Sequence, residues 1–152
     1  MKFSTRQDTD LPAEVLFGAV SDFDRLERLL LRRGAEVRRK DAGPVRAGTS
    51  WQIDFDWRGR PRELALTLAT YQPPEQMVFE GQSSHFNVEI KITVVALTRT
   101  KSRMLCEIDV APRGMKARLM IQTAKLAKGQ LDRKFAHRIE EFVNQIAVGQ
   151  PG

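Results

Sequence analysis

Residues 113–148 read RGMKARLMIQTAKLAKGQLDRKFAHRIEEFVNQIAV, and apolar residues recur in this run at steps of three and four. That spacing places them on one face of a helix. No proline interrupts the run, so the pattern predicts one continuous helix of roughly 30 residues, about 45 Å long. A helix of this kind needs a surface to pack on. Its predicted apolar face consists of Ala117, Met120, Ala124, Ala127, Leu131, Phe135, Ile139, Phe142 and Ile146.

The residues that precede this helix alternate between apolar and polar types, which is typical of strands with one buried face. The clearest case is residues 51–57, which read WQIDFDW. Turns of hairpin length separate the strands and predict antiparallel neighbours. Further alternating runs cover residues 64–68, 77–81, 86–94 and 104–110.

The N-terminal part of the chain predicts one polar edge strand at residues 2–8, followed by two short helices. Pro12 suits the first turn of the first helix, Asp22 can cap the second, and Gly34 can close it. Strands and helices are thus segregated along the chain, as in α+β proteins. We predict a curved antiparallel sheet of about six to seven strands that wraps around a long C-terminal helix.

The composition predicts a soluble globular protein, because hydrophobic residues make up 41% of the chain and charged residues 29%. A length of 152 residues predicts a single domain over 1–152, with the last few residues as a disordered tail. No apolar run approaches the ~20 residues of a membrane span. We also find no apolar signal segment and only one cysteine. These features predict a cytoplasmic protein without disulfides.

The net charge of +6 arises from 25 Lys and Arg residues against 19 Asp and Glu residues. Such an excess attracts anionic partners weakly, and salt screens the attraction. Because the basic residues are spread over the chain, we interpret them as a solvated surface and do not expect a nucleic-acid partner.

Several segments resemble the START-like, or SRPBCC, superfamily in its polyketide cyclase/dehydrase-type branch. The segments LPAEV (11–15) and AVSDF (19–23) resemble its first-helix signature, and FEG (79–81), FNVEI (86–90) and VAPRG (110–114) are also similar to it. The resemblance covers nearly the whole chain. It implies the helix-grip fold, with a deep apolar cavity between sheet and helix. In relatives this cavity holds lipids, sterols, polyketides, hormones or quinones.

We expect the cavity beside the first half of the long helix, because Ala117, Ala124 and Ala127 leave room that larger residues would fill. A close-packed core without a void is the alternative. His85 lies in a predicted turn and is the candidate for a polar contact at the cavity mouth. The expected lining is mostly apolar and consists of Trp51, Ile53, Phe55, Leu66, Leu68, Met77, Phe79, Phe86, Val88, Ile90, Met104, Cys106, Ile108, Met120, Ala124, Ala127 and Leu131.

Leu119, Ile121 and Leu126 lie off the apolar face of the long helix. They are consistent with a gate, a homodimer contact or a membrane-touching surface, or with plain packing. Gly129 lies within the predicted helix and is consistent with a bend, a close approach or a tolerated surface glycine.

The sequence predicts no metal site, no cofactor and no catalytic residue. His85 and His137 are far apart in the pattern, and no HExxH spacing occurs. The alternation places Asp54 and Asp56 on the solvent face and Cys106 in the core, where a thiol is inert. Gly-rich phosphate loops and the GxSxG run of hydrolases are also lacking.

Three functional hypotheses follow. The first is a protein that binds a small hydrophobic or lipid-like molecule in an apolar cavity. The second is a cyclase/aromatase- or dehydratase-like enzyme, whose candidate polar residues are Tyr71, Gln82, Ser84, His85 and Arg113. The third is a protein- or ribosome-associated module that uses the basic surface together with Leu119 and Leu126.

Overall fold

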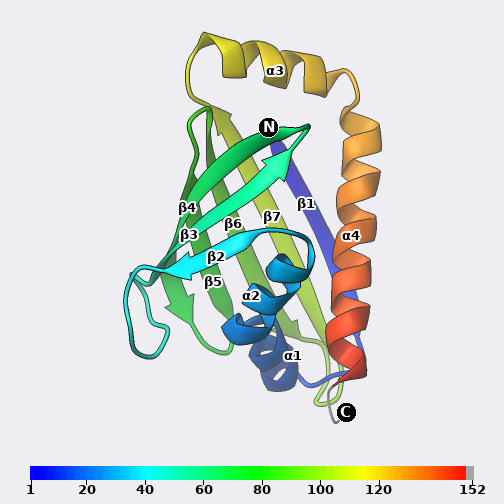
Figure 1. Cartoon of the computed structure of the whole chain (residues 1–152). Coiled ribbons are helices and arrows are strands. Elements are labelled where there is room, and N and C mark those ends of the chain that lie inside the picture. The colour runs from blue at the N-terminus through cyan, green and yellow to red at the C-terminus, as the bar shows by residue number, and fades with distance from the viewer. Residues whose placement is uncertain (150–152) are drawn as a thin grey trace.

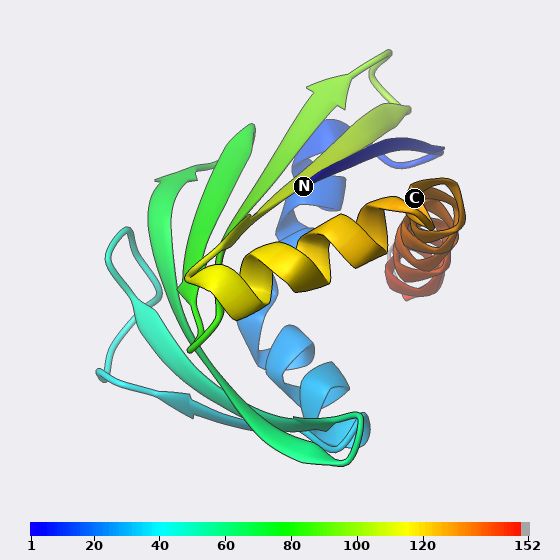
Figure 2. The same cartoon turned by 90° about the horizontal axis from the view of Figure 1, so that it is seen from above.

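The computed structural model describes residues 1–149 and contains one seven-stranded antiparallel sheet, with the strand order β1-β7-β6-β5-β4-β3-β2 (Figure 1). The predicted α+β class is confirmed, as is the edge position of the first strand. Figure 2 shows that the sheet is curved and that the helices lie on its concave side. The strands are β1 (Lys2–Thr9), β2 (Glu36–Arg39), β3 (Ser50–Trp57), β4 (Arg60–Gln72), β5 (Gln76–Gln82), β6 (Phe86–Ala96) and β7 (Ser102–Pro112).

The turn between β3 and β4 sets the register of the central hairpin. Arg58 has a φ of 53° and Gly59 a φ of 73°. Two successive residues with positive φ are typical of the type I′ turn, whose twist matches that of the flanking strands. The turn pairs Trp57 with Arg60, and from there the register places Trp51 opposite Leu66. Residues directly opposite each other share a face of the sheet, so both side chains belong to the concave side.

Two short helices follow β1 and cover one end of the concave side (Figure 1). The first, α1 (Ala13–Val20), buries Leu16, Phe17 and Val20. The second, α2 (Phe23–Arg32), begins after Asp22, whose carboxylate accepts a hydrogen bond from the Arg25 backbone nitrogen at 3.2 Å. α2 has a strongly apolar face, but none of its residues is fully buried. Its apolar side is therefore only partly covered.

The predicted continuous helix over 113–148 is wrong in one respect, because the structure divides it. The first part, α3 (Met115–Lys125), and the second, α4 (Lys128–Val148), meet at Leu126 and Ala127 and run in clearly different directions (Figure 1). The backbone nitrogen of Leu126 donates to the Thr123 carbonyl at 3.2 Å, and that of Ala127 donates to the Ala124 carbonyl at 3.0 Å. These i→i−3 bonds tighten and end the first helix.

Packing against two different strands accounts for the division. In α3, Ala117 and Ile121 are buried, and the helix lies next to the end of β7, across one end of the sheet (Figure 2). α4 lies along β1, where the rings of Phe135 and Phe3 meet edge to face at 5.8 Å. A straight helix could not reach both places.

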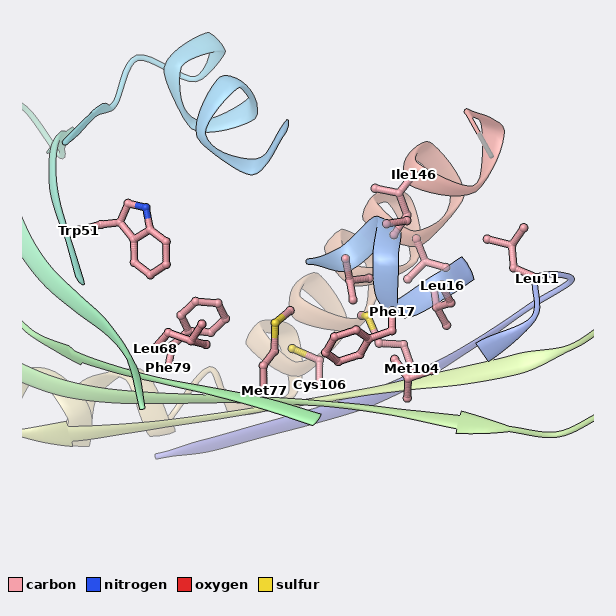
Figure 3. Packing of buried hydrophobic residues seen from close by; sticks show 14 of the residues in the cluster. Leu11, Leu16, Phe17, Trp51, Leu68, Met77, Phe79, Met104, Cys106 and Ile146 are labelled. Carbon is pink, nitrogen blue, oxygen red and sulfur yellow. The ribbon is translucent and has the colours of Figure 1, made fainter. Parts of the chain in front are cut away.

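The hydrophobic core lies between the sheet, α1 and the second half of α4. Figure 3 shows Trp51 and Phe79 at one end of the cluster, and Leu11 and Ile146 at the other. The five strands β3 to β7 thus contribute buried residues to one core, together with α1 and α4. The largest fully buried side chains are Leu16, Val20, Leu68, Met77, Met104, Val143 and Ile146, with Thr49 and Ser102 as buried polar residues.

No helix within residues 1–149 combines the length and the apolar character that a membrane crossing would need. The disordered tail expected at the last few residues falls on 150–152, which lie outside the described residues.

Candidate functional site

A groove of about 410 Å³ opens on the concave side of the sheet, between α2 and the second half of α4. It is partly open to solvent and mainly apolar. Its volume lies within the roughly 300–1,000 Å³ of ligand pockets in proteins. The groove is lined by Phe23, Leu26, Glu27, Leu29, Leu30, Arg33, Val37, Trp51, Ile53, Leu66, Phe79, Arg138, Glu141, Phe142 and Gln145.

Three aromatic rings from different elements form one wall of the groove. The Phe23 ring of α2 stacks on the Trp51 ring of β3, with the centroids 5.6 Å apart. Phe79 of β5 contacts both, at 6.3 Å from Phe23 and 6.2 Å from Trp51. Aromatic pairs in these geometries stabilise each other beyond the area they bury. The wall is therefore preformed.

The indole of Trp51 also fixes α2 to the sheet. Its Nε1 donates a hydrogen bond to Oε1 of Glu27 at 2.8 Å. Trp51 itself is buried, whereas Glu27 is partly exposed. This bond provides the buried indole N–H with an acceptor, which buried tryptophans usually have. It also occupies one oxygen of the Glu27 carboxylate.

The floor of the groove depends on a glycine. Gly81 lies opposite Leu66 in the β4–β5 register. A Cβ atom at Gly81 would lie 3.0 Å from Cδ1 of Leu64 and 3.3 Å from Cδ1 of Leu66. Because that space is free of a side chain, the two leucines can lie over the backbone of β5. A larger residue at Gly81 would crowd Leu64 first and also Leu66, which lines the groove.

The opposite wall comes from α4. Phe142 contributes a partly buried ring, and Arg138, Glu141 and Gln145 lie at the exposed rim. Nη2 of Arg25 donates to the carbonyl oxygen of Gln145, a groove-lining residue, at 3.1 Å. This contact joins α2 directly to the end of α4.

The charged groups at the rim differ in how they are engaged. Glu27 accepts the Trp51 hydrogen bond, and Glu141 pairs with Nε2 of His137. No salt bridge among the described residues involves Arg33 or Arg138. The two guanidiniums are thus the groups at the rim that remain available to an anion.

Four residues of the predicted lining do line this groove, namely Trp51, Ile53, Leu66 and Phe79. Leu68, Met77, Met104 and Cys106 are buried in the core and do not line the groove. The remaining members are partly buried residues elsewhere: Phe55, Phe86, Val88, Ile90, Ile108, Met120, Ala124, Ala127 and Leu131.

The sequence predicted a cavity beside the first half of the C-terminal helix, whereas this groove borders residues 138–145 in its second half. The break at Leu126 and Ala127 turns α3 away from the groove, so its alanines cannot line it. The residues of α2 were missed, although Leu26, Leu29 and Leu30 carry a signal: an apolar face on a short helix that the core only partly covers.

The polar residues considered for catalysis do not form one cluster. Gln82, Ser84, His85 and Arg113 line a separate, more polar depression near the β5–β6 turn, where Arg113 Nη1 donates to the Ser83 carbonyl oxygen at 2.5 Å. His85 therefore does not lie at the mouth of the groove. Tyr71 lies apart from them, with its ring 6.2 Å from Phe17 and 6.0 Å from Phe23.

The other titratable candidates lie in the surroundings that the alternation predicted. Burial raises the pKa of the Cys106 thiol to about 12, and the Glu107 carboxylate adds to the shift. Asp54 pairs with Arg38 at 3.2 Å across the β2–β3 register, on the opposite face from Trp51. In the part of the chain that the structure describes, no group of three or more His, Cys, Asp or Glu residues is placed to hold a metal ion.

No protein-family model and no curated protein matches the sequence. Solved structures do match the fold. The Zhui aromatase/cyclase from Streptomyces sp. R1128 is similar with a TM-score of 0.68 and 10% identity, over 97% of this chain and 93% of that chain. A START superfamily protein from Mycobacterium smegmatis is similar with a TM-score of 0.53 and 18% identity, over 91% and 98%.

An HSP90 activator from Plasmodium falciparum is also similar, with a TM-score of 0.54 and 17% identity, over 76% of this chain and 77% of that chain. These neighbours confirm the resemblance to the START-like superfamily at the level of the fold. The chain has the helix-grip fold. At such low identity the likeness carries the fold alone.

Proposed function

We propose that this protein binds a small, largely apolar molecule in the groove between α2, the sheet and the second half of α4. The observation that carries the proposal is the groove itself, which has a volume of about 410 Å³ and a mainly apolar lining. Apolar side chains around an open space gain little from folding unless something fills the space. A bound molecule would supply those missing contacts.

The wall of Phe23, Trp51 and Phe79 favours a ligand with a flat ring system, because such a ligand can stack on aromatic faces. At the rim, Arg33 and Arg138 favour a ligand whose polar end is anionic. A guanidinium binds a carboxylate or sulfonate through charge-assisted hydrogen bonds. We therefore propose an aromatic or polycyclic acid as the preferred ligand class.

The proposal is limited to binding. Arg33, Arg138 and Glu141 are exposed at the rim, and the Glu27 carboxylate is engaged by Trp51. The fold neighbours include a protein described as an aromatase/cyclase, but the polar residues considered for such chemistry lie outside this groove. The lining offers no paired acid and base facing an enclosed reactant.

Two fluorescent probes test the ligand class. 8-Anilinonaphthalene-1-sulfonate carries a sulfonate, and N-phenyl-1-naphthylamine has the same ring system without it. We expect both probes to bind to the folded protein with enhanced fluorescence. Replacing Arg33 and Arg138 by Gln should lower the affinity for the anionic probe about tenfold. The affinity for the neutral probe should stay nearly unchanged, because only the anion forms charge-assisted hydrogen bonds with the two guanidiniums.

A matched pair in α2 tests the location. Leu29→Trp places a larger side chain in the groove, whereas Leu31→Trp makes the same change at a 54% exposed residue that does not line it. We expect the first variant to lose probe binding by about tenfold or more, since the added ring occupies the ligand's space. Equal probe binding by the two variants, or no binding by the unmodified protein, would contradict the proposal.

Native mass spectrometry of the protein as purified can identify a natural ligand. We expect a discrete added mass that is released on denaturation as an aromatic or polycyclic acid. The same analysis of Leu29→Trp should show the protein without that mass.

A further inference from the structure

The outer face of α3 carries large apolar side chains that the rest of the protein leaves uncovered. Met115 is 70% exposed, Leu119 57% and Leu126, at the end of the helix, 89%. Ile121, which the sequence grouped with Leu119 and Leu126, is instead buried beside Ala117. Packing therefore explains one of the three off-face residues and leaves the other two exposed.

The exposed residues form a stripe along α3. At about 100° per residue, Met115, Leu119 and Leu126 fall within an arc of about 40°, and the buried Ala117 and Ile121 lie on the opposite side. α3 thus has two apolar sides, one packed on the protein and one facing outward.

Basic residues flank the outer stripe on both sides. Lys116 lies on one side of the stripe, and Arg118 and Lys125 lie on the other. Around the helix axis, each is about 60–80° from the nearest apolar residue of the stripe. The sequence contains no Asp or Glu from residue 110 to residue 131, a segment that also includes Arg113 and Lys128. The charge of this surface is therefore of one sign.

The position of α3 makes the stripe accessible. The helix crosses one end of the molecule, next to the tip of the sheet and ahead of α4 (Figures 1 and 2). In Figure 2 it lies in front of the other elements, so its outer side faces away from the body of the protein. The whole stripe can meet a flat surface at once.

We propose that the outer face of α3 docks on an anionic lipid bilayer. The apolar stripe enters the boundary between headgroups and acyl chains, while the lysine and arginine side chains lie at the level of the anionic headgroups. This occupant uses both features of the face. A nucleic acid would engage the cations and leave the leucines in water.

A second copy of the chain fits the surface less well. Stable protein–protein interfaces bury roughly 800 Å² on each partner, and one face of an 11-residue helix offers much less. Two such faces would also bring like charges together. The docking inference does not depend on the groove, because no residue of α3 lines it.

Co-sedimentation with vesicles tests the proposal on the full chain. We expect the protein to bind vesicles of phosphatidylcholine mixed with phosphatidylglycerol, and to remain in solution with phosphatidylcholine alone. The double variant L119S/L126S and the triple variant K116Q/R118Q/K125Q should each lower binding by about fivefold or more, because they remove the apolar and the electrostatic contribution respectively.

Matched controls change the same residue types elsewhere. The double variant L31S/L97S alters two other exposed leucines, and R28Q/R32Q/R99Q removes three exposed charges outside α3. Both should bind within about twofold of the unmodified protein if the contact is specific to α3. Equal losses in α3 variants and controls would indicate general charge attraction and overturn the proposal. Binding to neither vesicle would also overturn it.

A site-specific probe distinguishes insertion from mere proximity. Cys106 is 3% exposed, so a thiol label reacts selectively with a cysteine introduced by Leu126→Cys. A polarity-sensitive dye at residue 126 should shift to the blue on addition of anionic vesicles, and the same dye on Leu97→Cys should not. The proposal would be overturned if the dye showed no blue shift with vesicles. A blue shift with soluble nucleic acid, or with the protein alone at high concentration, would then identify that molecule as the partner of this face.

Discussion

Replacing Ile146 by Ala should destabilise the protein strongly, because this side chain anchors the second half of α4 in the core. Ile146 is fully buried and belongs to the cluster that also contains Leu11, Leu16 and Val143. The substitution removes three carbons at about 0.8 kcal/mol each, and the cavity that remains adds to the loss. We expect the free energy of unfolding to fall by about 3–4 kcal/mol.

Thermal and urea denaturation, followed by circular dichroism, measure this loss. For a protein of this size, each kcal/mol lowers the melting temperature by about 2–4 °C, so Ile146→Ala should lower it by about 6–16 °C. The urea midpoint should fall with little change in slope, because the extent of unfolding is the same.

The control lies two residues further along the same helix. Val148 is 88% exposed at the end of α4, so Val148→Ala should change the free energy of unfolding by less than about 0.5 kcal/mol. If Ile146→Ala cost no more than Val148→Ala, the end of α4 would not be packed in the core. The wall that it contributes to the groove would then lose its support.

Three further changes test individual contacts. Because burial raises the pKa of the Cys106 thiol to about 12, a thiol reagent at pH 8 should react only after unfolding; reaction of the folded protein would contradict that burial. A hydrogen bond and the positive charge from Arg103 lower the pKa of Asp8 in the folded protein. The pair therefore stabilises the fold at pH values above the pKa of Asp8 in the unfolded chain. This stabilisation is lost as the pH falls through the lower pKa of Asp8 in the folded protein. An NMR titration of Arg103→Gln should show the Asp8 pKa rising, and an unchanged value would refute the pairing. Ser102→Ala removes the bond from Oγ to the Leu11 carbonyl oxygen at 2.7 Å and should cost about 1–3 kcal/mol in urea denaturation; a loss below about 0.5 kcal/mol would mean that water replaces it.

The sheet could be predicted from the sequence because its determinants are local. The alternation of Trp51 and Ile53 with polar residues fixes which face is buried, and the positive-φ pair at Arg58 and Gly59 fixes one hairpin. A shift of one residue would expose every apolar side chain of the strand. The buried face, the hairpin turns and the edge position of the first strand therefore follow from short segments of sequence.

The break in the C-terminal helix depends on contacts that a local pattern does not contain. The apolar spacing continues without a change of phase through Leu126 and Ala127, and Gly129 follows the break without lying at it. The helix is divided because its two parts pack in different places. Ile121 of α3 is buried beside β7, whereas Phe135 of α4 packs on β1. Tertiary packing overrides the pattern here.

The same break explains why this groove does not lie beside the first half of the C-terminal run. The alanines of the first half of the run leave room only if that half lies over the sheet, and α3 instead crosses its end. The groove occurs between α2 and α4, where Leu29 and Leu30 are only partly covered. Predicting it would require the distance between two elements, which periodicity does not provide.

The most direct test of ligand binding in the groove is an ¹H–¹⁵N NMR titration that follows the two indole N–H signals. Trp51 Nε1 lies in the groove and donates to Glu27, whereas Trp57 is 45% exposed at the β3–β4 turn. Trp57→Phe assigns the signals. Addition of 8-anilinonaphthalene-1-sulfonate should shift the Trp51 signal in a saturable manner and leave the Trp57 signal in place. A Trp51 signal that stays unchanged at saturating probe, or a shift of Trp57 alone, would show that the molecule binds elsewhere.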